Sequence, residues 1–74
     1  MNTAFDLEVR YLRTVIRNYE ILKNENLEAL VLPEVVASAL ETRRLERNIW
    51  DCACEIRRVQ EEVYALQAEH FKPP

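Results

Sequence analysis

The residue types that carry out covalent or metal chemistry are few in this chain, and their spacing keeps them apart. Cysteines stand at positions 52 and 54, and the single histidine is His70. Side chains two residues apart on a helix point about 200° apart, so a disulfide between Cys52 and Cys54 is not expected. His70 would lie about 27 Å from Cys52 along one helix, too far for a shared zinc ion. We expect free thiols and no metal.

The sequence also gives no indication of catalysis or of a cofactor. Ser38 is the only serine and lies in an apolar stretch, with no base at a recognisable spacing. Glu69 and His70 are adjacent and would point in different directions on a helix. The chain has no glycine, which phosphate-binding loops need for their close backbone approach. We therefore predict a protein that is not an enzyme.

One group of arginines could bind phosphate groups. Arg10, Arg13 and Arg17 share a face of the first predicted helix, opposite its apolar side. Asp6 and Glu20 lie on that same face, so a solvated surface with weak ion pairs, for example between Asp6 and Arg10, is the favoured interpretation. Because the formal net charge is −3, nucleic-acid binding is the alternative hypothesis rather than the main one.

A second group of arginines surrounds the only tryptophan. On a helical wheel this group falls within one arc, and Trp and Arg are the residue types that most often anchor protein interfaces. An exposed Trp lowers solubility unless something covers it. Either it is covered within the protein or its dimer, which is the more ordinary case, or it belongs to a partner-binding patch. The candidate patch consists of Arg43, Arg47, Trp50, Arg57 and Tyr64.

The hydrophobic periodicity predicts the elements that position these residues. Thr3 and Asp6 form a T-x-x-D helix-start signal, and apolar residues recur at helical spacing after it. Polar residues interrupt the pattern at 24–26, and Pro33 suits the first turn of a new helix. We predict one domain over 1–74, with a first helix at about 3–25, a connector at about 26–32 and a second helix at about 33–71.

The apolar residues of the first helix spread over a wide arc. They span about 160° of the helical wheel, more than one neighbouring helix requires. We therefore expect this helix to touch two others. The arc contains Ala4, Phe5, Val9, Tyr11, Leu12, Val15, Ile16, Tyr19 and Leu22.

The most regular feature is a 4-3 spacing of apolar residues over three heptads of the second predicted helix. Below about 70 to 80 residues, one such core rarely supplies more than about 3 to 5 kcal/mol of stability. We therefore expect self-association into a homodimeric four-helix bundle, parallel or antiparallel, with a monomeric hairpin as the alternative. In an antiparallel dimer Cys52 would lie near the two-fold axis. The self-association residues are Leu45, Ile49, Cys52, Ile56, Val59, Val63 and Leu66.

These observations predict an all-α, two-helix antiparallel hairpin with a long second helix. No apolar run approaches the roughly 18 to 20 residues that span a bilayer, and no signal-peptide pattern is present, so we expect a cytoplasmic protein without membrane contact. The predicted function is a small protein-binding module: an adaptor, an assembly cochaperone or a stoichiometric inhibitor. An arginine-mediated nucleic-acid-binding or regulatory protein is the alternative. The sequence does not identify the partner.

Overall fold

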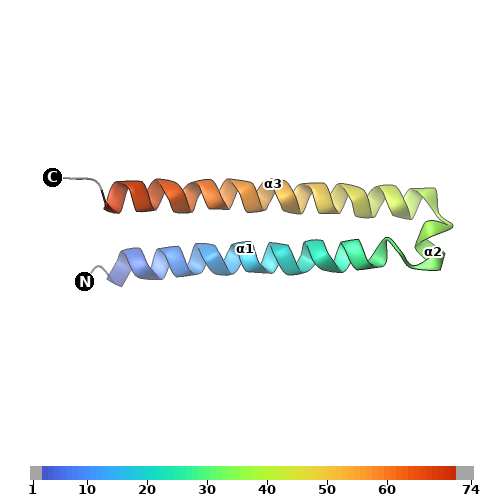
Figure 1. Ribbon diagram of the computed structural model, residues 1–74, viewed down its shortest axis with the longest axis horizontal. Helices are drawn as coiled ribbons and strands as arrows, with labels where there is room; N and C mark the ends of the chain where they lie inside the picture. The colour runs from blue at the N-terminus through green and yellow to red at the C-terminus, as the bar shows by residue number, and fades with distance from the viewer. Residues whose placement is uncertain (1–2, 72–74) are drawn as a thin grey trace.

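The computed structural model describes residues 3–71, which form a helical hairpin (Figure 1). Two long helices, α1 (Thr3–Ala29) and α3 (Ala39–His70), run antiparallel, and a short helix, α2 (Pro33–Val36), lies in the turn between them. The start of α1 and the end of α3 therefore lie at the same end of a rod that measures 59 × 16 × 12 Å. The all-α hairpin with a longer second helix is confirmed.

The first helix is one turn longer than the sequence predicted. The prediction ended it near residue 25 because Asn26 belongs to a polar interruption, but α1 continues to Ala29. Asn26 is buried and faces α3, where its amide nitrogen donates to the Leu22 carbonyl at 2.7 Å and its amide oxygen accepts from Asn48 at 3.4 Å. Because both ends of its side-chain amide are bonded, this polar residue is accommodated on the inner face of a helix.

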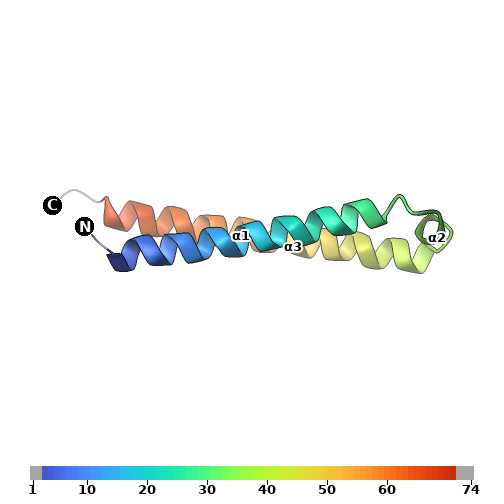
Figure 2. The same ribbon diagram turned by 90° about the horizontal axis from the view of Figure 1, so that it is seen from below.

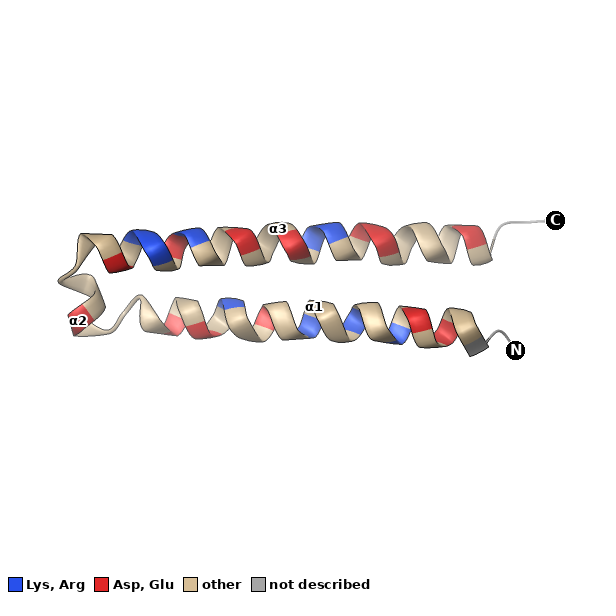
Figure 3. Ribbon diagram, turned by 180° about the vertical axis from the view of Figure 1, so that it is seen from behind, with Lys and Arg blue, Asp and Glu red and all other residues tan. Residues whose placement is uncertain are grey.

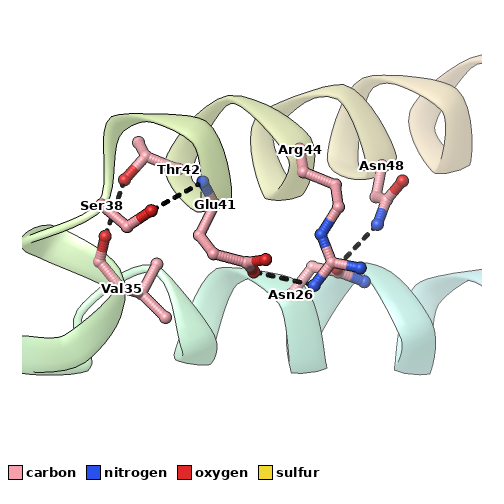
Figure 4. A network of polar contacts seen from close by, with 7 residues as sticks. All are labelled: Asn26, Val35, Ser38, Glu41, Thr42, Arg44 and Asn48. Carbon is pink, nitrogen blue, oxygen red and sulfur yellow. Dashed lines mark hydrogen bonds and ion pairs between the residues drawn. The ribbon is translucent and has the colours of Figure 1, made fainter.

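The predicted single helix over 33–71 is wrong in its first turns, where the chain forms two helices. Pro33 does begin a helix, but α2 ends at Val36, and Ser38 has an extended backbone with φ −118° and ψ 107°. The Ser38 hydroxyl accepts a hydrogen bond from the Glu41 backbone N–H at 3.2 Å and so caps α3 (Figure 4). This S-x-x-E spacing is a helix-start signal in the sequence that the periodicity had obscured.

Further hydrogen bonds hold the turn against α3. The Val35 carbonyl accepts one from the Thr42 hydroxyl at 3.1 Å and one from the Ser38 backbone N–H at 2.9 Å. Val35 is itself buried. The short helix α2 is therefore fixed to the start of α3 by both an apolar side chain and polar contacts.

A single apolar seam runs between α1 and α3, which lie side by side in both views (Figures 1 and 2). Its centre is a cluster of Val9 and Leu12 from α1 with Val59 and Val63 from α3. At the open end, the Phe5 ring stacks on the His70 ring with centroids 3.8 Å apart. Partly buried residues that pack against the cluster are Phe5, Val15, Ile16 and Leu66.

Replacement of Val59 with alanine tests this core. Val59 is the most buried large side chain, at 1% exposure, so the loss of two methyl groups and the resulting cavity should lower the free energy of unfolding by about 2 kcal/mol. The measurement is urea unfolding followed by circular dichroism. Val31→Ala, at a strongly exposed valine, is the matched control and should change stability by less than about 0.5 kcal/mol. Equal effects of the two substitutions would contradict the assigned core.

Replacement of Ser38 tests the cap that separates α2 from α3. Ser38→Ala removes the acceptor for the Glu41 N–H and should cost about 1 kcal/mol of stability in the same unfolding assay. Ser38→Asp keeps an acceptor at the same place and should retain most of the stability. If the aspartate variant is as unstable as the alanine variant, Ser38 does not act as a cap.

Candidate functional site

The residues predicted to mediate self-association form the core of the single hairpin. Five of them, Leu45, Cys52, Ile56, Val59 and Val63, are buried. Ile49 and Leu66 are partly buried. Because α1 covers this seam, association through these side chains would require α1 and α3 to separate. The heptad pattern thus describes a contact within one chain, and a dimer built on the same seam stays a prediction.

The predicted protein-binding residues are all brought to one exposed face of α3. Trp50 is 70% exposed and Tyr64 is 65% exposed. Arg43, Arg47 and Arg57 are exposed as well. Within residues 3–71, neither the connector nor α1 covers Trp50, so the interpretation in which a single chain buries it is wrong.

These five residues belong to a longer row that we call the α3 outer stripe. Its members recur at alternating spacings of three and four residues, and every one of them is exposed. The predicted protein-binding residues did not include four members of this row, although the same spacing identifies them: Leu40, Cys54, Glu61 and Ala68. The stripe consists of Leu40, Arg43, Arg47, Trp50, Cys54, Arg57, Glu61, Tyr64 and Ala68.

The arginines of α3 differ in whether the chain itself neutralises them. Arg58 bonds to Glu55 at 2.9 Å and to Glu62 at 2.8 Å, and Arg44 bonds to Glu41 at 2.8 Å. The hydrogen bond and charge of Glu55, with a smaller contribution from the charge of Glu62, raise the pKa of Arg58 above its ordinary value. These cations are engaged by carboxylates of the same helix, along which charges of both signs occur (Figure 3).

The arginines of the outer stripe are much less engaged. Arg57 approaches Glu61 at 3.7 Å, the longest of the ion pairs among the described residues, and the two side chains are 84% and 69% exposed. Such a pair contributes little to stability. Arg43 and Arg47 form no ion pair with any described residue. The stripe therefore presents guanidinium groups beside the exposed indole of Trp50. Two of these groups, those of Arg43 and Arg47, have no carboxylate partner among the described residues.

The arginines of α1 line a shallow groove near the open end of the hairpin. Arg10, Arg13 and Arg17 share this groove with Gln67 and Phe71 of the other arm. The four ion pairs among residues 3–71 all lie within α3. The expected ion pair between Asp6 and Arg10 is therefore not among them. The face is exposed to solvent, as predicted. The predicted ion pairs are absent from it among residues 3–71.

The wide apolar arc of α1 is only partly covered. Val9 and Leu12 are buried by α3, whereas Tyr11 and Leu22 on the flank of the arc are exposed. The second helical neighbour expected for α1 is absent from the described chain. Other exposed apolar side chains gather around the turn: Leu27, Val31, Leu32, Val36 and Leu40.

The reactive residues are not assembled into a chemical site. Cys52 is a buried free thiol and Cys54 is an exposed one. Within residues 3–71, His, Cys, Asp and Glu side chains do not gather in any group of three or more suited to a metal ion. Over the same residues, each helix is either too short or too polar to cross a membrane. The α3 outer stripe, with its exposed arginines and aromatic rings, is therefore the candidate functional site.

Comparison with known proteins adds no family to this description. The chain matches no family model, and no curated protein or solved structure is significantly similar to it.

Proposed function

We propose that this chain is a small, non-enzymatic protein-binding module that uses the α3 outer stripe as its binding surface. The observation that carries the proposal is the exposed Trp50 beside Arg43 and Arg47, two guanidinium groups without an ion pair in the described chain. Buried Trp and Arg contribute most of the binding energy in many protein interfaces. The module would act by stoichiometric occupation of a partner, as an adaptor, an assembly cochaperone or an inhibitor.

The large surface of the hairpin supports association of some kind. The chain exposes 6052 Å² and has a radius of gyration of 17.0 Å. A compact protein of this mass would expose roughly 4,800 Å² and have a radius of gyration of roughly 11 Å. The excess, together with the exposed apolar residues on both long helices, favours a second chain that covers part of the rod. A homodimer, including the four-helix bundle, belongs to this proposal.

A location in the cytoplasm is part of the same proposal. Its support is the pair of free cysteines, one of them exposed. Exposed thiols persist in reducing compartments and tend to be oxidised outside them.

Replacement of Trp50 tests the binding surface. Because Trp50 is exposed, Trp50→Ala should leave the helicity and the urea midpoint of unfolding nearly unchanged. A protein that the immobilised wild-type chain retains from a cell lysate should bind the Trp50→Ala variant at least about tenfold more weakly. The measurement is circular dichroism together with quantitative mass spectrometry of the retained proteins. Tyr11→Ala removes a similarly exposed aromatic ring from α1 and is the matched control, with unchanged retention. Equal retention by both variants, or unfolding of the Trp50 variant, would refute the proposal.

Nucleic-acid binding through the groove on α1 is the second candidate. It is favoured by one observation, the three arginines Arg10, Arg13 and Arg17 that line this groove without ion pairs. Each phosphate contact should contribute about 0.7 to 0.9 to the slope of log affinity against log salt concentration.

A titration with mixed-sequence DNA and RNA at two salt concentrations tests this second candidate. Under this hypothesis binding is steeply salt-dependent, and changing Arg10, Arg13 and Arg17 together to glutamine abolishes it. The control changes Arg43 and Arg47 to glutamine and should preserve binding. Absence of binding at low salt would exclude this function.

A further inference from the structure

The α3 outer stripe has an internal symmetry that its individual residues do not reveal. Cys54 stands at its centre, with Arg47 seven residues before it and Glu61 seven residues after it. Leu40 and Ala68 stand fourteen residues before and after Cys54. The stripe thus carries a cation and an anion at equal distances on opposite sides of a small central residue.

The aromatic residues follow the same arrangement, offset by one position. Trp50 lies four residues before Cys54 and Arg57 three residues after it. Arg43 lies eleven residues before Cys54 and Tyr64 ten residues after it. Each exposed ring is therefore matched by an arginine at nearly the same distance on the other side. An offset of one residue corresponds to about 1.5 Å along a helix, which is well within the reach of an arginine side chain.

These matches acquire a physical meaning when two copies of α3 run antiparallel about a two-fold axis at Cys54. Residues equally far before and after Cys54 then meet at the same height. Arg47 of each copy faces the oppositely charged Glu61, and Trp50 faces Arg57 in a cation–π geometry. Arg43 likewise faces Tyr64, and the small Cys54 side chains meet at the axis. Because a two-fold axis duplicates every contact, each pair occurs twice.

We propose that the partner of the α3 outer stripe is a second copy of this chain, packed antiparallel with the two Cys54 residues adjacent at the axis. This inference rests on the proposed function, in which the stripe is a protein-binding surface, and names its occupant. The Arg57–Glu61 contact within one chain is long and exposed, so Glu61 is available to bond Arg47 of the other copy.

Other two-fold-symmetric arrangements of the same two stripes place like charges together. In a parallel pair, Arg43, Arg47 and Arg57 each face their own copies. In an antiparallel pair, moving one copy by one heptad places Arg57, to within one residue, opposite Arg57 when the copy moves in one direction and opposite Arg43 when it moves in the other. Like charges held opposite one another disfavour these registers, so the charge pattern selects both the orientation and the alignment.

Oxidative cross-linking tests the position of the axis. Diamide takes two electrons and two protons from a pair of thiols, and should convert the purified wild-type chain into a disulfide-linked dimer on a non-reducing gel. Cys54→Ser should abolish this product, since Cys52 is buried. In the matched control, Cys54→Ser is combined with Tyr11→Cys, which places an exposed thiol on α1, and cross-linking should be much slower.

Charge exchange tests the facing residues. In sedimentation equilibrium, Arg47→Glu and Glu61→Arg should each raise the dimer dissociation constant at least about tenfold, because each creates two repulsive contacts. The double variant should return to within about threefold of wild type. Arg17→Glu makes the same charge change on α1 and should have no such effect. As the only tryptophan, Trp50 should also shift its fluorescence to longer wavelength upon dilution, in parallel with dissociation.

The outcomes separate this inference from the proposed function. The inference would be overturned if the chain dimerised but diamide did not cross-link it through Cys54, and the double variant with Arg47→Glu and Glu61→Arg did not recover the wild-type dissociation constant. A monomer at all concentrations would overturn it too, and the proposed function would still stand if Trp50→Ala, but not Tyr11→Ala, abolished retention of another protein. If neither a dimer nor Trp50-dependent retention is found, both proposals are wrong.

Discussion

A pair of antiparallel helices can bury only the side chains along one line of contact, and this limit governs how the chain distributes its residues. Val59 lies on the line and is 1% exposed, whereas Trp50 lies on the far side of the same helix and is 70% exposed. No third element of comparable length is present in residues 3–71 to cover either helix from outside. Most of α3 and one flank of α1 therefore remain surface, although the composition is 49% hydrophobic. The charged and aromatic character of the outer stripe follows from this geometry, because such side chains combine apolar surface with a polar group and can remain exposed to water when no partner is bound.

An apolar seam with heptad spacing does not by itself fix how two helices align, since sliding by one heptad preserves most contacts. Polar and aromatic residues at specific heights supply the missing constraint here. The Asn26–Asn48 hydrogen bond lies near the turn, and the Phe5–His70 ring stack lies at the open end. Any shift would leave the buried Asn26 without its partner, which costs more than the bond itself contributes. The hairpin is thus held in one alignment at both ends, and the outer stripe is presented on a rigid support.

Periodicity in the sequence was sufficient to predict the hairpin, because helical spacing and a central proline leave few alternatives. It could not predict the end of α1, since the buried Asn26 side chain is accommodated partly by a hydrogen bond from Asn48, which is distant in sequence. The break at Ser38 was predictable in principle from Ser38 and Glu41, but a continuous apolar pattern favoured a single helix. The residues predicted to bind a partner lie together on one exposed face of α3, and their role in binding stays a prediction. The exposure of Trp50 was not predictable, because the same wheel position could have been covered by the connector or by a neighbouring helix.

The sequence also left open which helix would cover the heptad seam, because a helix of the same chain and a helix of a second chain satisfy the same pattern. Chain connectivity decides between them. The short turn holds α1 at a high effective concentration beside α3, so the seam forms within one chain before a second chain can compete. A second contact must then use what the first leaves exposed, and the fraction of chains that form it must depend on protein concentration. The division between the two faces of α3 is consistent with this order: the inner face carries mainly apolar residues, which are buried when the chain folds. The outer face carries arginine, glutamate and aromatic residues, whose directional contacts suit a reversible association that discriminates between partners.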